Sequence, residues 1–385
     1  MTRPAGSVVF VSSHAGLGGA EGYLDRLLRR LPQEWLGGVV FIGEGPAADR
    51  LRDLDTEVIV LPRGRRWRAL LGLGRLRKTV VGLDPSVVHA HGVLAAMATG
   101  LALLFTRIPI LWLKVDFSRD GLLANLIATR CRLIVGISQV VVSGFPGPLR
   151  GRTRAVHCGI PEYEFDRDQA RGAALELTGW PADAELVLVS GRLGTGKGQV
   201  ELVEAAPAIL AARPRAHFLL LGSADPFHAE YAVGLAERVQ ELGLGERLLI
   251  RDVAHDQDDP AIEAVRITAG SDVVVVPSVT EPGSGWREGF GLVGAEAFCV
   301  GTPVVAYRNG SLPEVLGDCA RMVDEGDREG LAAEVTGVLA DPALRARMTE
   351  CGRRIVAERY RMDRAVDGME RCYLEAARGR LTRSS

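Results

Sequence analysis

Short apolar runs alternate with amphipathic segments along the whole chain. Runs of this length, rich in Val, Ile and Leu, predict buried strands, and the periodic segments between them predict helices. Regular alternation of the two is typical of parallel sheets with helices on both faces. The expected strands are SVVFVSS, GVVFIGE, EVIVLP, SVVHAH, IPILWLK and RLIVGIS in the first half, and ELVLVSG, HFLLLGS, RLLIRDV, DVVVVPS and TPVVAY in the second.

The strand series is interrupted between residues of about 160 and 184, where the chain is polar and contains proline. A length of 385 residues suits two domains. We therefore expect a first domain over 1–165 and a second over 166–360, two doubly wound α/β units with a cleft between them. The last long helical pattern is expected to break near Tyr360.

Composition and charge narrow the class of protein. Hydrophobic residues make up 47% of the chain, enough for two cores, which excludes disorder. Residues 1–150 contain 19 Lys and Arg against 11 Asp and Glu, whereas the net charge of the whole chain is −2. A basic first half indicates an anionic partner, and ordinary solvated helix faces explain the same imbalance equally well.

Cysteine usage and the apolar segments bear on the compartment. The six cysteines show neither CxxC nor metal-ligand spacing, so we expect reduced core residues of a cytoplasmic protein. The first strand begins without a preceding basic region and cleavage site, which argues against a signal peptide. Arg107 and Pro109 divide the longest apolar stretch, Val93–Leu113, into pieces too short to span a bilayer.

The segment GRLGTGKG follows an expected strand and precedes a helix. Its glycines, Gly191 among them, let the backbone approach a ligand, and Arg192 and Lys197 place two cations beside it, as a diphosphate requires. The segment also matches the P-loop pattern up to its last position, where Gly198 replaces the magnesium-binding Ser or Thr. A P-loop ATPase and a plain structural turn therefore remain as alternatives.

The segment REGFGLVGAEAF places Glu288 and Glu296 eight residues apart, around a strand-to-helix loop. Backbone N–H groups at such a helix N-terminus suit an anionic ligand. Carboxylates accept pairs of hydroxyl hydrogen bonds, as sugar recognition requires. A solvated carboxylate is the alternative for either residue, and Glu281 competes with Glu288 for its role.

With its surroundings, PSVTEPGSGWREGFGLVGAEAFCVGTPVVAY, this segment resembles the retaining glycosyltransferases of family four, which have the GT-B fold. The resemblance extends to GLGGAE, VVHAHG, GRLGTGKG and NGSLPEV, and so covers nearly the whole chain. It implies two Rossmann-like domains facing across a cleft, with the C-terminal helix, 361–385, crossing back to the first domain. In most members of the family, PS is followed almost directly by EGFGL. Here the segment VTEPGSGWR intervenes, and its glycines and Trp286 could form a flap.

The resemblance also implies roles for individual residues. Arg192 and Lys197 would hold the donor diphosphate, Glu288 the donor sugar, and Glu296 the ribose. The backbone of the loop before the helix would face the sugar and phosphates, so Gly289, Phe290, Gly291 and Leu292 join the donor site. Three glycines of other loops would let the backbone approach the donor closely: Gly18, Gly19 and Gly191.

The first half supplies candidates for the acceptor side, since ligands in open parallel sheets lie beyond the carboxyl ends of the strands. A structural turn explains Gly18 and Gly19 as well. His89 and His91 have a spacing that could suit a metal, but no carboxylate or Cys accompanies them, so a sugar contact or a structural role for His91 is preferred. The family often has a His where this chain has WLKVD. The candidates are His14, His91, Lys114, Asp116 and Ser138.

Two weaker signals concern surfaces and metals. Arg63–Lys78 combines seven cations with an apolar stripe, so it predicts either peripheral contact with the inner membrane face or a solvated helix. The DQD at Asp256–Asp258 resembles a metal motif of other glycosyltransferases but lies in a polar loop, and RDVAH (Arg251–His255) is the expected base-side loop.

Together these features predict a retaining, metal-independent glycosyltransferase that moves a sugar from a UDP- or GDP-linked donor to a hydroxyl acceptor. A lipid, a glycan and a natural-product intermediate are all compatible acceptors. The expected partners are this nucleotide sugar and the acceptor, with no cofactor, metal or nucleic acid. A related sugar-nucleotide enzyme, an epimerase or pseudo-glycosyltransferase, is the alternative.

Overall fold

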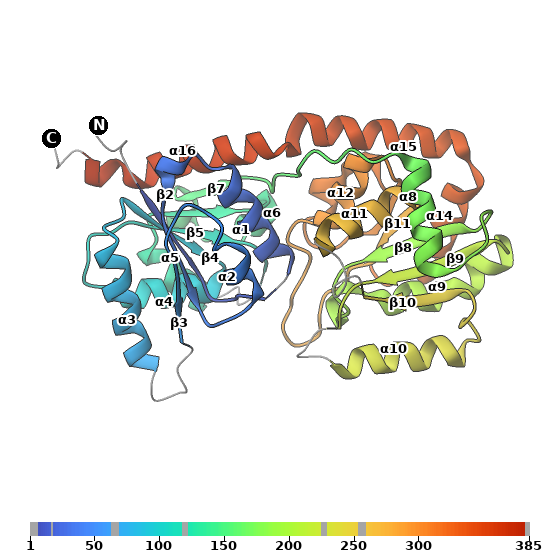
Figure 1. Ribbon diagram of the computed structural model, residues 1–385, viewed down its shortest axis with the longest axis horizontal. Coiled ribbons are helices and arrows are strands. Elements are labelled where there is room, and N and C mark those ends of the chain that lie inside the picture. Colours follow the sequence, from blue (N-terminus) through green and yellow to red (C-terminus); the bar gives the residue numbers. More distant parts are fainter. Residues whose placement is uncertain are drawn as a thin grey trace. The chain divides into compact units, whose positions relative to one another are not determined.

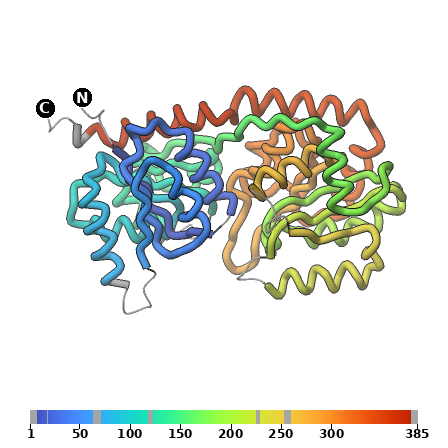
Figure 2. The backbone as a smooth tube through the Cα atoms, viewed as in Figure 1, coloured from blue at the N-terminus to red at the C-terminus, as the bar shows by residue number. Residues whose placement is uncertain are grey.

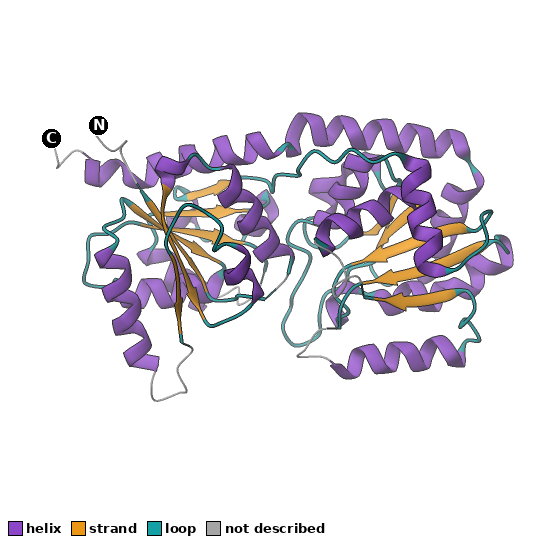
Figure 3. Cartoon of the chain, viewed as in Figure 1, coloured by secondary structure: helices purple, strands orange, loops and turns teal. Residues whose placement is uncertain are grey.

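A computed structural model describes residues 7–16, 18–62, 69–117, 122–224, 229–252 and 259–381. The chain divides into two compact units, Met1–Pro161 with Arg361–Ser385 (unit 1) and Glu162–Tyr360 (unit 2). In each unit a parallel sheet is covered by helices (Figure 1; Figure 3). The predicted α/β class with two doubly wound sheets is confirmed.

Unit 1 contains a seven-stranded sheet in the order β3-β2-β1-β4-β5-β6-β7. The order reverses between β1 and β4, which is the position where ligands bind in such sheets. Its strands are β1 (Val8–Ser12), β2 (Leu36–Ile42), β3 (Val58–Leu61), β4 (Val87–His91), β5 (Ile110–Lys114), β6 (Leu133–Gly136) and β7 (Thr153–Ala155). Its helices are α1 (Gly19–Arg30), η1 (Gln33–Trp35), α2 (Pro46–Arg50), α3 (Ala69–Gly82), α4 (Val93–Ala102), α5 (Leu122–Arg130), α6 (Gln139–Ser143), α7 (Gly147–Arg150) and α16 (Met362–Leu381).

Unit 2 contains a six-stranded sheet in the order β10-β9-β8-β11-β12-β13. Its strands are β8 (Glu185–Ser190), β9 (Ala216–Leu221), β10 (Leu248–Arg251), β11 (Val273–Val276), β12 (Val304–Tyr307) and β13 (Arg321–Val323). Its helices are α8 (Arg167–Thr178), η3 (Thr195–Lys197), α9 (Gln199–Ala212), α10 (Ala229–Glu241), α11 (Pro260–Gly270), α12 (Leu292–Val300), α13 (Leu312–Leu316), η4 (Gly317–Cys319), α14 (Arg328–Ala340), α15 (Pro342–Ile355) and η5 (Val356–Tyr360).

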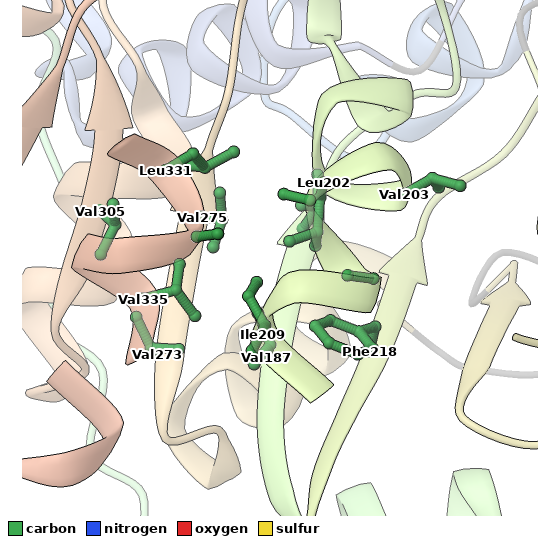
Figure 4. Packing of buried hydrophobic residues seen from close by; sticks show 14 of the residues in the cluster. Val187, Leu202, Val203, Ile209, Phe218, Val273, Val275, Val305, Leu331 and Val335 are labelled. Atoms are coloured by element: carbon green, nitrogen blue, oxygen red, sulfur yellow. The ribbon is translucent and has the colours of Figure 1, made fainter. Parts of the chain in front are cut away.

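The core of unit 2 lies between its sheet and helices α9 and α14 (Figure 4). Val187, Val273 and Val305 on the strands face Leu202 and Val335 on the helices, and all five side chains are fully buried. Strands buried on both faces explain why the apolar runs of the sequence are continuous rather than alternating.

All the predicted strands are present, but β7 and β13 were missed. Both are three residues long and lie at sheet edges, and Arg154 and Arg321 within them are exposed. Edge strands of this kind have only one paired side and little burial, so their sequences lack the apolar run that marks the central strands.

The last long helical segment is interrupted at η5, a π-helical turn that ends at Tyr360, where the break was expected. Beyond it the chain returns to unit 1 as α16 (Figure 2). There a hydrogen bond of 2.8 Å joins the Tyr373 hydroxyl to Nδ1 of His89 on β4. The Tyr373 ring lies edge-on to that of Phe10 on β1. The C-terminal helix is therefore part of the packing of the first sheet.

The expectation that all cysteines are reduced is wrong for two of them. Cys319 in η4 and Cys351 in α15 form a disulfide, with Cα atoms 5.2 Å apart. They are 32 residues apart in sequence, a spacing that carries no motif, so only the packing of α15 against η4 brings them together. Cys131, Cys158, Cys299 and Cys372 are free thiols.

Candidate active site

The loop from β8 to α9 carries the first two cationic candidates. The loop begins at Gly191, which follows β8 and has φ +136°. Arg192 is exposed, and Thr195–Lys197 form the 3₁₀ turn η3. The carbonyl of Arg192 accepts a hydrogen bond of 3.0 Å from Nε2 of buried Gln199. The loop is therefore anchored to the first turn of α9 while the Arg192 side chain reaches solvent.

Lys197 and Glu288 are brought together across 91 residues of sequence. The Lys197 Nζ lies 2.7 Å from Oε2 of Glu288, whose side chain is only 10% exposed against 31% for the lysine. The carboxylate side chain is thus more deeply buried than that of the lysine. Three ammonium donors allow Lys197 to keep this ion pair and still donate to an anionic ligand.

Four further residues form hydrogen bonds with Glu288. Ser278, after β11, donates its hydroxyl to the same Oε2 at 3.0 Å, and the N–H of Gly291 also donates to the carboxylate. Asn309, after β12, accepts from the Glu288 N–H at 2.9 Å, and the Ser311 N–H donates to its carbonyl at 2.9 Å. The backbone and the carboxylate of Glu288 are therefore both positioned by neighbouring strand ends.

These contacts set the protonation state of Glu288. Burial alone would raise the pKa of its carboxyl, but the charge of Lys197, its hydrogen bond, and those of Ser278 and Gly291 outweigh burial. The net effect holds the pKa of Glu288 below its ordinary value. The carboxylate is consequently an acceptor for hydroxyl groups, as sugar binding needs.

Asn309, Gly310 and Ser278 were not singled out from the sequence. Gly310 has φ +52°, and a Cβ there would lie 2.2 Å from the carbonyl oxygen of Glu288, so only glycine fits. Asn309 also donates to Glu325 at 2.8 Å. The NGSLPEV motif was a usable signal, because its first residues form the turn that supports Glu288.

The segment between β11 and Glu288 folds over Lys197. The Lys197 Nζ lies 5.0 Å from the ring centroid of Trp286, a cation–π distance, and a Cβ on Gly196 would lie 2.4 Å from that ring. The Glu281 N–H donates to the Trp286 carbonyl at 2.9 Å, and Thr195 donates its hydroxyl to the Glu281 carboxylate. Glu281 thus fastens this segment to η3, whereas Glu288 faces Lys197, which favours Glu288 as the site carboxylate.

Helix α12 carries the second predicted carboxylate. Its N-cap is Gly291 at φ +84°, where a Cβ would lie 2.4 Å from Leu312. Leu292 begins the helix, Gly289 and Phe290 are buried, and the Phe290 ring packs edge-on against Tyr360 at 5.4 Å. Glu296 is half-buried one turn further along. Phe290 therefore contributes its backbone to this loop, and its side chain belongs to the core.

The acceptor-side candidates of unit 1 follow four adjacent strands. His14 follows β1, His91 ends β4, Lys114 ends β5 and Ser138 follows β6, and the pairing Ser12↔His91↔Leu113 places these ends at one edge of the sheet. Gly18 caps α1 in extended conformation and Gly19 begins it, as the strand-to-helix loop predicted. The candidates are therefore gathered at the edge where ligands bind in open sheets.

His91 is buried at the end of β4, in contact with α1. It is 4% exposed, and its Nε2 lies 3.0 Å from the carbonyl oxygen of Ala20 in α1. Burial lowers its pKa to about 4, against the opposing effect of this hydrogen bond, so the ring is neutral near pH 7. In the described ranges, no cluster of His, Cys, Asp and Glu could hold a metal ion.

Lys114, Asp116, Ser138 and His14 differ in what they offer a ligand. Lys114 is 2% exposed and donates to the backbone carbonyl of Asp116. Ser138 is fully buried and caps α6 by accepting from the Val141 N–H. His14 is exposed, with its Nδ1 3.1 Å from the Ser13 hydroxyl. Of these four, His14 is the most accessible.

Three features of the sequence lie partly or wholly outside the described residues. They are the basic segment Arg63–Lys78 (63–68 are not described), the DQD at Asp256–Asp258, and the expected base-side loop Arg251–His255 (253–255 are not described). Within the described ranges, no helix combines the length and apolarity needed to cross a membrane.

Residues 174–355 match the family model of glycosyl transferases group 1. The match covers 182 of the 385 residues, just under half of the chain. The match contains Arg192, Lys197, Glu288 and Glu296, the residues on which the resemblance was recognised. The predicted relationship is thereby confirmed.

Curated relatives agree with this assignment. The chain is 28% identical over 249 residues to the GDP-mannose-dependent monoacylated alpha-(1-6)-phosphatidylinositol monomannoside mannosyltransferase of Corynebacterium glutamicum, covering 63% of this chain and 61% of that protein. It is 31% identical over 229 residues to the D-inositol 3-phosphate glycosyltransferase of Saccharomonospora viridis, covering 58% and 50%. The chain thus spans about half to three-fifths of the length of these relatives.

Solved structures show the fold. Anabaena HepE in complex with UDP-glucose has a TM-score of 0.82 at 21% identity, over 95% of this chain and 98% of that one. Sucrose-phosphate synthase of Thermosynechococcus elongatus has a TM-score of 0.74 at 21% identity, over 98% and 100%. The predicted GT-B fold is confirmed.

Proposed function

We propose that the chain is a retaining glycosyltransferase that moves a sugar from a UDP- or GDP-linked donor to a hydroxyl acceptor, without a metal. The observation that carries this proposal is the buried Glu288 carboxylate in an ion pair with the partly exposed Lys197. It combines an acceptor for sugar hydroxyls with a cation for a phosphate in one site. The group 1 family match over the same residues supports it.

In this proposal the two cations of the β8–α9 loop bind the donor diphosphate. Arg192 is exposed beside the loop, and Lys197 is partly exposed in its ion pair. As the sugar–phosphate bond breaks, negative charge grows on the diphosphate, and fixed cations stabilise that charge most where water is excluded. The diphosphate can thus be neutralised by side chains alone.

The carboxylates select and orient the sugar and the ribose. Glu288 accepts from hydroxyls of the donor sugar, and Glu296 accepts from the ribose. The N–H groups at the start of α12 face the phosphates and sugar. In a retaining reaction, the departing phosphate oxygen takes the proton of the attacking hydroxyl. The reaction therefore requires no side-chain base. This agrees with the absence, within WLKVD, of the His that the family usually has.

The P-loop alternative is disfavoured by the geometry of Gly198. This residue has φ +65°, and a Cβ there would lie 1.9 Å from the carbonyl oxygen of Pro277. The magnesium-binding Ser or Thr of a P-loop therefore has no room at this position. The lysine that would cradle β- and γ-phosphates is instead paired with Glu288.

Thermal stability in the presence of UDP, GDP, ADP and ATP, each with and without magnesium, tests the proposal. A ligand at 100 times its dissociation constant stabilises the folded state by about 2.7 kcal/mol. We expect UDP or GDP to raise the melting temperature without magnesium. A rise with ATP only in the presence of magnesium would overturn the proposal in favour of a P-loop protein.

Donor and acceptor classes follow from turnover. UDP-glucose and GDP-mannose are informative donors, because HepE binds the first and the Corynebacterium relative depends on the second. Release of the diphosphate and the anomeric configuration of the product, read by NMR, test transfer and retention together. A product of inverted configuration would contradict the retaining mechanism.

A further inference from the structure

Most of the exposed large apolar side chains of the described chain gather on three consecutive helices of unit 1. α3 contacts α4 and α4 contacts α5, so the helices form one layer on the sheet (Figure 1). Exposed apolar side chains gathered on one layer of helices indicate an interaction site. We call it the α3–α5 face; its exposed apolar residues are Leu71, Val81, Leu101, Leu104, Phe105, Leu122 and Leu126.

Helix α4 is apolar on every side. Its inner face buries Ala95, Ala96 and Thr99 against the sheet. Its outer face continues through Leu101 into Leu104 and Phe105, of which Phe105 is 86% exposed. A helix without a polar face is suited to cover on both sides, and the exposed residue within α4 is Leu101, next to Leu104 and Phe105.

The turn that presents Phe105 is firmly held. The Arg130 guanidinium at the end of α5 donates to the carbonyl oxygens of Leu103 at 2.8 Å and Thr106 at 3.3 Å, on either side of the aromatic residue. These contacts tie the turn after α4 to α5. Phe105 therefore projects from a fixed platform, and inserting it into an apolar phase costs little ordering of the backbone.

Cations outnumber carboxylates in this part of the chain. Residues 69–82, 85–115 and 122–161 contain no Asp or Glu. Arg75, Arg77 and Lys78 on α3 are exposed, as is Arg107, two residues after Phe105. Asp84, Asp116 and Glu162 are the described carboxylates that border these segments.

We propose that the α3–α5 face docks on an anionic lipid surface, with Phe105 and its neighbouring leucines entering the acyl boundary and the cations meeting the headgroups. Apolar insertion combined with basic residues is how peripheral proteins bind anionic membranes. A second copy of the chain is a poorer cover, because a two-fold interface would press the same patch, with its cations, against itself. A membrane contact was expected of Arg63–Lys78. In this proposal the apolar side chains that enter the membrane come mainly from α4, the turn after it and α5.

Vesicle flotation with the full chain tests this face. We expect the wild type to float with vesicles of phosphatidylcholine and phosphatidylglycerol at low salt, and to be released as sodium chloride screens the cations. Phosphatidylcholine alone should bind it weakly. Phe105→Ser and Leu126→Ser should each lower partitioning about tenfold, the loss expected for one large apolar side chain.

Unit 2 offers matched controls. Val233 and Ile262 are 59% and 48% exposed on α10 and α11, so Val233→Ser and Ile262→Ser should leave flotation unchanged. Circular dichroism should show all four variants folded, because the side chains concerned are exposed. Equal flotation of the Phe105→Ser and wild-type chains, or no flotation of the wild type, overturns the proposal. A concentration-dependent dimer in sedimentation velocity that Phe105→Ser dissociates also overturns it.

Discussion

The Nζ of Lys197 lies 2.7 Å from Oε2 of Glu288, although the two residues belong to different strand-to-helix connections of unit 2. The strands that precede them, β8 and β11, are neighbours in the sheet. Parallel strands end at the same edge, so the topology itself brings a cation from one loop and a carboxylate from the next into contact. The pair is the centre of the proposed donor site.

Removing the cation should abolish most of the activity. Lys197→Ala deletes the charge that would stabilise the departing diphosphate, and a loss of about 100-fold or more in transfer is expected from one such group. It also leaves the buried Glu288 without its ion pair, which should lower the free energy of unfolding by about 2 kcal/mol. Initial rates of diphosphate release and urea unfolding measure the two effects.

Lys78→Ala is the matched control for this variant, since Lys78 is exposed on α3 in unit 1. It should change neither transfer to a water-soluble acceptor nor stability. Near wild-type transfer by Lys197→Ala would remove Lys197 from the site.

Glu296 should act on activity without acting on stability. Its side chain is half-buried on α12, and Glu296→Ala removes the group proposed to hold the ribose. Transfer should fall about 100-fold or more, by the same reasoning as for Lys197. The melting temperature should stay within a degree or two of the wild type, because surface substitutions typically change stability by less than about 0.5 kcal/mol. Glu358→Ala, at an exposed position of η5, is the control; if it lowers transfer equally, the ribose assignment fails.

Trp286 should report on donor binding, because its ring lies against the ammonium of Lys197. A diphosphate that approaches Lys197 changes the electrostatic environment of the indole, so UDP or GDP should alter the tryptophan emission. Trp286→Phe should abolish that change, whereas Trp180→Phe, next to His217, should retain it. Trp286→Ala should weaken nucleotide binding about fivefold, from a cation–π contribution of about 1 kcal/mol. A nucleotide response that survives in Trp286→Phe would place the diphosphate elsewhere.

Much of this arrangement was predictable from the sequence. The central strands are continuous apolar runs, and the residues at their carboxyl ends are the candidates, so fold and site could be located together. The sequence marked the turn at Asn309 through NGSLPEV, but not its contact with Glu288, because Ser278 and Asn309 meet Glu288 only through strand order. The same holds for Cys319 and Cys351, whose contact depends on the packing of α15. The contact of His91 with α1 was not predictable either, because the sequence cannot show that the Ala20 carbonyl lies next to its ring.

Restoring the P-loop consensus should damage the protein instead of converting it. Gly198→Ser forces a non-glycine residue to φ +65° and places its Cβ 1.9 Å from the Pro277 carbonyl oxygen. Left-handed strain costs about 1–3 kcal/mol and overpacking about 1–3 kcal/mol more. Thermal melting should show this loss, with no gain of magnesium-dependent ATP binding. Gly172→Ser, where a Cβ meets nothing within 4 Å, is the control. A stable Gly198→Ser chain that binds ATP with magnesium would revive the P-loop reading.

Acid should destabilise unit 1 through its buried histidines. Burial lowers the pKa of His91 to about 4 and that of His89 well below its ordinary value, so both are neutral when folded. The unfolded chain binds protons at about pH 6.5, so the contribution of His91 is complete above that pH and is lost as the pH falls toward 4. The expected loss is about 3 kcal/mol for His91. His91→Asn cannot take up the proton, and urea unfolding at a series of pH values should give it a shallower slope than the wild type between pH 6.5 and 4. An unchanged slope would mean that His91 is protonated in the folded protein, contrary to its enclosure by β4 and α1.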